Sequence, residues 1–192
     1  MMKYRIILSA LIALSACTQR EKPENISAVV GNKLPDSLLI KPGGRVGEIK
    51  IGGDMQALLK QYGKPDQQDA AMGSAAYTWF AGHDTTGYRT SVYGHRNFGA
   101  GDESVLSIKK IITTSNEFTT PEGVRVGMNM DDVSRSYQLT GDSKYSIKGK
   151  TILVFANIGK GISFDIDSAT KKCMAINIFK PGDTSAVNIN IY

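Results

Sequence analysis

The side chains best suited to acid–base chemistry near neutral pH are the two histidines, His83 and His95. His83 falls in a loop predicted at 81–87, and His95 falls in a loop predicted at 95–103. A strand predicted at 88–94 separates the two loops and, at about 3.3 Å per residue, places them roughly 20 Å apart. Because zinc needs its ligands within about 2.0–2.2 Å of one ion, this spacing argues against a shared metal site, and either loop alone offers too few ligands.

The acidic residues and glycines form no catalytic pattern. The sequence contains no Gly-x-Ser-x-Gly elbow and no His-Glu-x-x-His motif. The run 99–101 (Gly-Ala-Gly) has no helix start behind it and predicts a flexible turn. Asp131 and Asp132 are expected in the first turn of a helix, where carboxylates interact favourably with the helix dipole. Asp165 and Asp167 flank an expected hairpin turn and are interpreted as turn residues, with weak calcium binding as the alternative. We therefore expect no enzymatic activity, no metal and no cofactor.

The loop 95–103 is the best candidate contact site in the sequence. It is longer than the tight turn expected at the corresponding place in the second half of the chain. Arginine and aromatic residues, which this loop contains, are enriched at binding hot spots. The candidate partner-binding residues are His95, Arg96, Phe98, Asp102 and Glu103. The alternative is a mobile loop without a function.

The start of the chain has the pattern of a bacterial export signal followed by a lipid-attachment cysteine. Lys3 and Arg5 form a basic start, and residues 6–14 form an apolar run. That run is shorter than the roughly 20 residues that a membrane-spanning helix needs. The run 14–17 (Leu-Ser-Ala-Cys) resembles the bacterial lipobox, so we expect cleavage before Cys17 and attachment of a diacylglycerol to its thiol. The alternative is an ordinary secretory peptide with an incidental cysteine.

The composition of the expected mature chain narrows the function classes. Removing the signal leaves 176 of 192 residues, enough for one domain or two small ones, and lowers the formal net charge from +5 to +3. No basic stripe is present, which argues against nucleic acid as a partner. Cys173, the other cysteine, is predicted as a buried strand residue. Thr18 follows the expected anchor in place of the aspartate that favours inner-membrane retention, so we expect a lipid-anchored protein of the outer membrane.

Two stretches of the sequence match at a constant offset of 75 residues. Residues 49–55 (Ile-Lys-Ile-Gly-Gly-Asp-Met) correspond to residues 124–130 (Val-Arg-Val-Gly-Met-Asn-Met), and Tyr62 corresponds to Tyr137. A match of this length predicts an internal repeat.

Each copy predicts a short extended segment followed by a helix. Asp54 and Asn129 are suited to cap the two helices, since their side-chain oxygens can accept hydrogen bonds from first-turn amides. Apolar residues after Asp54 fall on one helical face, and Gly63 can end the first helix in a left-handed conformation. This apolar face is interpreted as packing on the sheet, and the alternative is a groove for a partner.

Alternating apolar residues after each helix predict an antiparallel meander of three strands in each copy. The predicted strands are 75–80, 88–94 and 105–115 in the first copy and 151–156, 162–166 and 172–179 in the second. A short strand is predicted at 38–40, and the alternating run 187–191 predicts a final edge strand.

The expected fold class is therefore α+β, with two tandem repeats. Each repeat is a short helix followed by an antiparallel three-strand meander, and the helices pack on one face of the sheet. The expected organisation is a signal peptide at 1–16, a lipid anchor and flexible tether at 17–25, a first repeat with an N-terminal strand at 26–118, and a second repeat with a C-terminal strand at 119–192.

This arrangement resembles the tandem-repeat fold of the β-lactamase-inhibitor-protein family. A single copy resembles the small lipoprotein of the outer-membrane β-barrel assembly machine. The likeness covers about residues 45–180 and rests on the framework pairs Ile51-Gly52 and Val126-Gly127 and on the helix pattern. It implies the fold and protein binding through the sheet and loops, and it assigns no individual site residue.

We expect a non-catalytic protein-binding module of the cell envelope, held to the membrane by its N-terminal lipid and engaging another envelope protein. One alternative is an inhibitor of a secreted or envelope hydrolase, such as a β-lactamase or protease. Another alternative is a hydrolase that uses His83 or His95.

Overall fold

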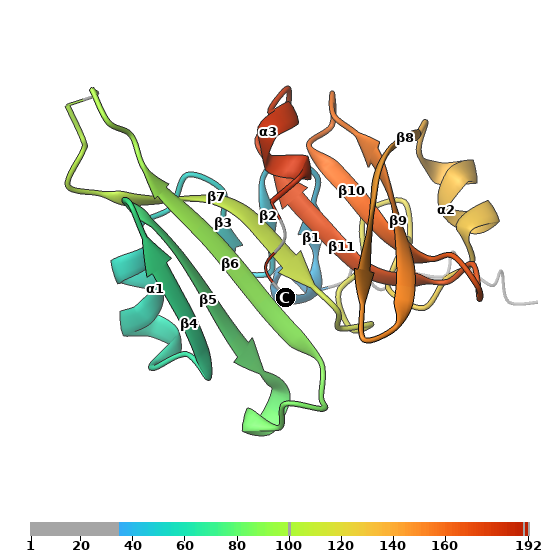
Figure 1. Cartoon of the computed structure of the whole chain (residues 1–192), viewed down its shortest axis with the longest axis horizontal. Helices are drawn as coiled ribbons and strands as arrows, with labels where there is room; N and C mark the ends of the chain where they lie inside the picture. The colour runs from blue at the N-terminus through green and yellow to red at the C-terminus, as the bar shows by residue number, and fades with distance from the viewer. Residues whose placement is uncertain (1–34, 100, 190, 192) are drawn as a thin grey trace, which may run out of the picture. The chain divides into compact units, whose positions relative to one another are not determined.

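An antiparallel sheet of eight strands is the main element of the fold (Figure 1). Its strand order is β4-β5-β6-β7-β11-β10-β9-β8, so β7 pairs with β11 in the middle, and β4 and β8 are the edges. The strands are β4 (Gln67–Ala71), β5 (Ser74–Phe80), β6 (Arg89–Arg96), β7 (Leu106–Thr113), β8 (Thr140–Ile147), β9 (Lys150–Asn157), β10 (Ile162–Asp167) and β11 (Cys173–Phe179).

The helices are few and short. They are α1 (Met55–Tyr62) before β4, α2 (Met130–Ser136) before β8, and α3 (Thr184–Val187) after β11. A small three-stranded sheet is formed by β1 (Ile40–Lys41), β2 (Arg45–Val46) and β3 (Ile49–Lys50), and the two 3₁₀ turns are η1 (Asp36–Leu38) and η2 (Ala81–His83). The predicted α+β class, with a large antiparallel sheet and few helices, is confirmed.

This computed structural model describes residues 35–99, 101–189 and 191. The expected signal peptide at 1–16 and the anchor and tether at 17–25, including Cys17, lie outside the described residues. No helix within the described part of the chain has the length and apolar character needed to cross a membrane.

The predicted N-terminal capping hydrogen bond is present at α1 but not at α2. Asp54 accepts a hydrogen bond from the backbone N–H of Gln56 at 2.9 Å, and Gly63 ends α1 with φ 76° while its N–H donates to the carbonyl of Leu59. Asn129 occupies the corresponding position before α2, but its side chain makes no capping hydrogen bond. The predicted cap is therefore present at α1 and absent at α2.

One face of the large sheet is apolar and packs against both longer helices. Met55 and Leu58 of α1 and Val133 of α2 belong to the same core as strand residues such as Ile111 and Phe164. Complete burial of side chains of this size contributes about 1.5–3 kcal/mol each. The core therefore joins the helices to the sheet.

The opposite face of the sheet buries polar side chains. These are Thr78, Ser91, Lys110, Ser163, Asp165 and Asn177, each at most 6% exposed. Asn177 donates to the Asp165 carboxylate at 2.9 Å, and the Lys110 ammonium donates to the carbonyl of Val187 at 3.0 Å and to that of Ile189 at 2.8 Å. Lys110 thereby holds the segment that follows β11 against this face.

Two strands were not predicted, so the expected three-strand meanders are wrong in number. β4 and β8 each add one strand, which gives four strands after α1 and four after α2. The β4 segment contains only Gln, Asp and Ala, residues that are depleted in strands or neutral toward them. The segment is a strand because it pairs with β5, and its own residues do not indicate that pairing.

The predicted C-terminal edge strand at 187–191 is also wrong. Asp183 accepts hydrogen bonds from the backbone N–H groups of Ser185 and Ala186, which starts the short helix α3 instead. Near the other end, the strand predicted at 38–40 begins only at Ile40, because residues 36–38 form η1. The alternating apolar residues from position 187 onward therefore do not correspond to a strand in the described part of the chain.

Candidate binding surface

The structure divides the predicted contact residues between a strand and a loop. His95 and Arg96 are the last two residues of β6 and not loop residues, because they pair with Ser107 and Leu106 of β7. Phe98, Asp102 and Glu103 lie in the loop that joins β6 to β7. The hairpin carries this loop to one end of the sheet, at the upper left of Figure 1.

Most polar groups of this loop hold the loop itself. The Arg96 guanidinium donates to the backbone carbonyls of Glu103 at 3.0 Å and Ser104 at 2.6 Å. The Glu103 carboxylate accepts the N–H of Gly99 at 2.6 Å, and Asp102 accepts from the amide of Asn97 at 3.1 Å. Arg96, Asp102 and Glu103 therefore shape the loop, and their side-chain groups are engaged inside it.

Phe98 is an exposed aromatic side chain of this loop. It is 65% exposed, and its ring meets the His95 ring edge-on with centroids 5.7 Å apart. The ring also lies against Gly73 of the β4–β5 turn, because a Cβ at Gly73 would be 2.5 Å from Phe98 Cζ. A hydrogen bond from the Arg96 N–H to the Gly73 carbonyl, 2.9 Å long, joins the turn to the strand.

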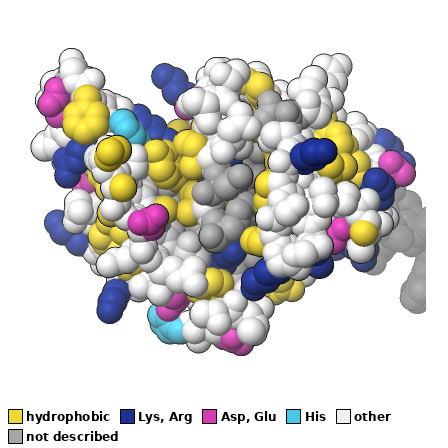
Figure 2. Space-filling view, in the orientation of Figure 1, with side chains coloured by type: hydrophobic (Ala, Val, Ile, Leu, Met, Phe, Trp, Pro, Cys, Tyr) yellow, Lys and Arg dark blue, Asp and Glu magenta, His cyan; other side chains and the backbone are white. Residues whose placement is uncertain are grey.

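The β4–β5 turn adds a second protruding apolar side chain. Met72 is 95% exposed, and both turn residues have left-handed backbones, with φ 49° at Met72 and 78° at Gly73. Left-handed conformations at both central positions are typical of a two-residue type I′ hairpin turn. We call Met72, Gly73, His95 and Phe98 the tip surface. Hydrophobic side chains lie beside a histidine and charged groups at the projecting end of the molecule in Figure 2.

Met72 was not among the predicted contact residues. The signal that could have identified it is the glycine that follows it between two short runs, since a residue before glycine is common in tight hairpin turns. Without a prediction of β4, no hairpin was expected there.

His83 and His95 are separated by most of the length of β6, the separation that the sequence predicted. His83 lies in η2 before β6, and β6 runs between it and His95. The His83 ring is 2.7 Å from the Asp66 carboxylate, which also accepts the N–H of Phe80. The Phe80 hydrogen bond first, and then His83, lower the pKa of Asp66. Because the His83 side chain is 78% exposed, this hydrogen-bonded pair lies at the surface of the protein.

The other acidic candidates have structural roles. Asp167 accepts hydrogen bonds from the N–H groups of Ala169 and Thr170, as predicted for a turn residue. Asp165 differs from the prediction, because it is buried in β10 and accepts from Asn177 and from the Tyr145 hydroxyl. Within residues 35–99, 101–189 and 191, no group of three or more metal-ligating side chains converges.

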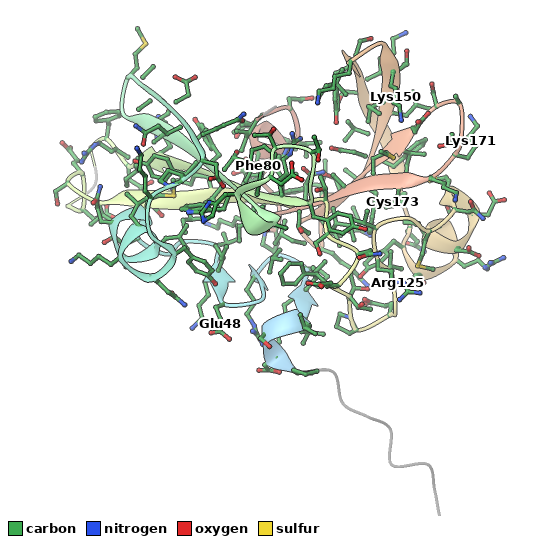
Figure 3. All side chains as sticks on the ribbon, turned by 90° about the horizontal axis from the view of Figure 1, so that it is seen from below. Glu48, Phe80, Arg125, Lys150, Lys171 and Cys173 are labelled. Carbon is green, nitrogen blue, oxygen red and sulfur yellow. The ribbon has the colours of Figure 1, made fainter. Side chains whose placement is uncertain are left out.

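Cys173 begins β11 and is fully buried, as predicted (Figure 3). Burial, followed by the neighbouring Asp165 charge, raises the pKa of its thiol. The thiol therefore stays protonated, and it is shielded from reagents in the folded protein.

The chain has a distant structural similarity to a solved protein and no match among family models or curated proteins. Among solved structures, an extracellular protein containing a SCP domain from Bacillus anthracis str. Ames is similar at 13% sequence identity, with a TM-score of 0.45. The match covers 71% of this chain and 46% of that chain, so this chain spans less than half of that protein.

Proposed function

We propose that this protein is a non-catalytic protein-binding module of the bacterial cell envelope, and that it binds its partner through the tip surface. The observation that carries the proposal is the exposure of two large apolar side chains on neighbouring turns at a projecting end, Met72 at 95% and Phe98 at 65%. Exposed apolar side chains grouped in this way are typical of interaction sites.

The energetics favour a contact role for these two residues. Burying one Phe or Met side chain in an interface releases about 1.5–3 kcal/mol, which corresponds to roughly tenfold to a hundredfold in affinity. The internal hydrogen bonds of Arg96 and Glu103 brace the loop, so less conformational entropy is lost on binding.

The proposal includes an internal repeat, in which the fold consists of two related units. Two equivalent hydrogen bonds support this: Gly52 donates to the carbonyl of Ile108, and Gly127 donates to that of Cys173. The helices α1 and α2 also start 75 residues apart, and a four-strand meander follows each. We assign the units to residues 26–118 and 119–192, and we propose that only the first carries a binding tip.

The envelope location rests on the sequence at the start of the chain. The basic start, the short apolar run and the lipobox-like residues 14–17 support export and lipidation of Cys17. Residues 18–34 could span at most about 60 Å, which allows a partner at or near the membrane. Mass spectrometry of the mature protein should find the N-terminus at Cys17 with acyl chains, and Cys17→Ser should release the protein from the membrane.

The binding proposal is tested by photo-crosslinking in cells of the producing bacterium. A photo-reactive residue at position 72 of the full chain should crosslink to one dominant envelope protein. Phe98→Ser should reduce the yield at least about tenfold, whereas Tyr88→Ser should leave it within about twofold. Tyr88 is a suitable control because it is 48% exposed and precedes β6, at the strand end opposite to Phe98.

Two outcomes would contradict or redirect the proposal. An equal yield in the Phe98→Ser and Tyr88→Ser variants would show that the tip surface does not bind the partner. A crosslinked β-lactamase or protease whose activity falls on addition of the purified chain would establish the inhibitor alternative.

A further inference from the structure

The strand β4 leaves one edge of the large sheet open. It pairs only with β5 among the described residues, and all five of its residues, Gln67–Ala71, are exposed. An open edge strand presents unpaired backbone N–H and C=O groups that can pair with another extended chain. β4 ends at Ala71, directly before Met72, so this edge runs into the tip surface.

The turn geometry indicates which groups of β4 point outward. In a type I′ hairpin the residues that flank the turn, here Ala71 and Ser74, are expected to form a hydrogen-bonded pair. Paired and unpaired positions alternate along an antiparallel ladder. The backbone N–H groups of Gln68 and Ala70 are therefore directed away from β5.

The second edge, β8, provides an internal comparison. Its hairpin turn has the same left-handed pair, with φ 49° at Lys148 and 76° at Gly149, so Ser146 corresponds to Ala70. However, β8 carries a bulge between Gly141 and Ser143 and an exposed Lys144. Bulges and edge lysines protect sheet edges from pairing. β4 has neither a bulge nor a lysine nor a proline.

The charge on β4 argues against a second copy of this chain as the occupant. Pairing β4 with its own copy over all five residues would set Asp69 opposite Asp69, and like charges directly opposite each other destabilise a sheet. A foreign strand with a lysine or arginine at that position would instead form an ion pair. Asp69 also faces a groove of about 350 Å³, lined by Ala76, Arg89 and Tyr93, that can accept neighbouring side chains.

We propose that the partner adds an extended segment to the sheet as a ninth strand along β4. The segment has at least five residues, a lysine or arginine opposite Asp69, and an apolar side chain that reaches Met72 and Phe98 at its end. This inference rests on the proposed function, since it specifies how the partner of the tip surface binds. Backbone hydrogen bonds along the edge then give affinity, and alternate side chains give specificity.

The test uses the full chain in cells of the producing bacterium, with photo-reactive residues placed separately at positions 68 and 72. Ala70→Pro removes one outward N–H and is tolerated at an edge strand, so it should lower the position-68 yield at least about tenfold. Ser146→Pro is the matched control at the other edge and should leave the yield within about twofold. Asp69→Lys tests the charge without altering the backbone and should reduce the yield to a similar extent.

Peptide mapping then identifies the occupant. A crosslinked segment of another protein with a basic residue beside an alternating apolar pattern is the expected result. A crosslink from position 68 to a second copy of this chain would overturn the proposal. An unchanged position-68 yield in both the Ala70→Pro and Asp69→Lys variants, with the position-72 crosslink intact, would overturn strand addition alone. If the photo-reactive residue at position 72 forms no crosslink to another protein in a chain without further substitutions, the proposed function is overturned as well.

Discussion

The effect of the contact between Gly73 and Phe98 can be measured separately from the effect of backbone strain, because a second glycine, Gly149, has the same turn conformation without that contact. Gly73 and Gly149 occupy the same position in their hairpin turns, with φ 78° and 76°. A Cβ at Gly73 would lie 2.5 Å from Phe98 Cζ, whereas a Cβ at Gly149 would meet no atom within 4 Å. The closest approach that distinguishes the two alanine substitutions is therefore the one to the Phe98 ring.

Backbone strain sets the expected loss of stability in both variants. An alanine in the left-handed region costs about 1–2 kcal/mol, partly offset by about 0.4–1 kcal/mol from the reduced freedom of the unfolded chain. We expect each variant to lose about 1 kcal/mol, or about 2–4 °C in Tm for a domain of this size. The Phe98 ring is 65% exposed and can swing away, so the clash at Gly73 adds little further loss.

The ring displacement has its own signature. In the parent chain, the ring current of Phe98 should shift the Gly73 Hα resonances, and the Gly149 Hα resonances should show no such shift. Urea unfolding, monitored by Trp79 fluorescence, measures the loss of stability in each variant. The crosslinking yield from a photo-reactive residue at position 68 measures partner binding. Gly73→Ala should lower this yield, whereas Gly149→Ala should not.

Two results would refute this reasoning. If Gly73→Ala costs more than about 1 kcal/mol beyond Gly149→Ala, the ring is packed rigidly rather than free to move. If both variants lose partner crosslinking equally, the loss comes from strain in the turns and not from a change in the tip surface.

Three further predictions follow from the packing and hydrogen bonds. Asp54→Ala should cost about 1 kcal/mol and Asn129→Ala only a few tenths in urea unfolding, because only Asp54 makes the capping bond; equal losses would contradict the cap assignment. Cys173 should react with a maleimide only after unfolding in urea, since it is fully buried, and rapid labelling of the native chain would show that β11 opens. Hydrogen bonds from backbone amides, and then Lys150, lower the pKa of Asp167. Asp167 therefore stabilises the fold above its unfolded pKa of about 3.9, and this stabilisation is lost as the pH falls through the lower folded value. The stability difference between the parent chain and Asp167→Asn should shrink below about pH 4, and a constant difference in thermal unfolding from pH 7 to pH 3 would contradict this.

Local patterns in the sequence were sufficient for several elements. The capping aspartate and the terminal glycine define α1, because both act within one turn of the helix that they bound. The strands β5, β6, β9, β10 and β11 follow alternating or continuous apolar runs, since burial on one or both faces selects such residues. Cys173 was predicted as a buried strand residue for the same reason.

The candidate site was predicted only in part. The sequence indicated Phe98 through its aromatic character in a glycine-rich loop, and the structure places it at a projecting end. Arg96 and Glu103 looked equally suited to contact a partner, but they form hydrogen bonds to backbone groups of the same loop. Whether a charged loop residue faces outward or inward depends on loop conformation, which composition does not specify.

By itself, the sequence determined which segments alternate between apolar and polar residues and where α1 begins and ends. Only the tertiary structure decided that Gln67–Ala71 is an open sheet edge among the described residues and that Gly73 lies against Phe98, a residue distant from it in the chain. Only it decided that the residues after β11 form α3 and lie under Lys110. The physical reason is that these features depend on pairing between segments distant in sequence, whose energies a local pattern does not contain.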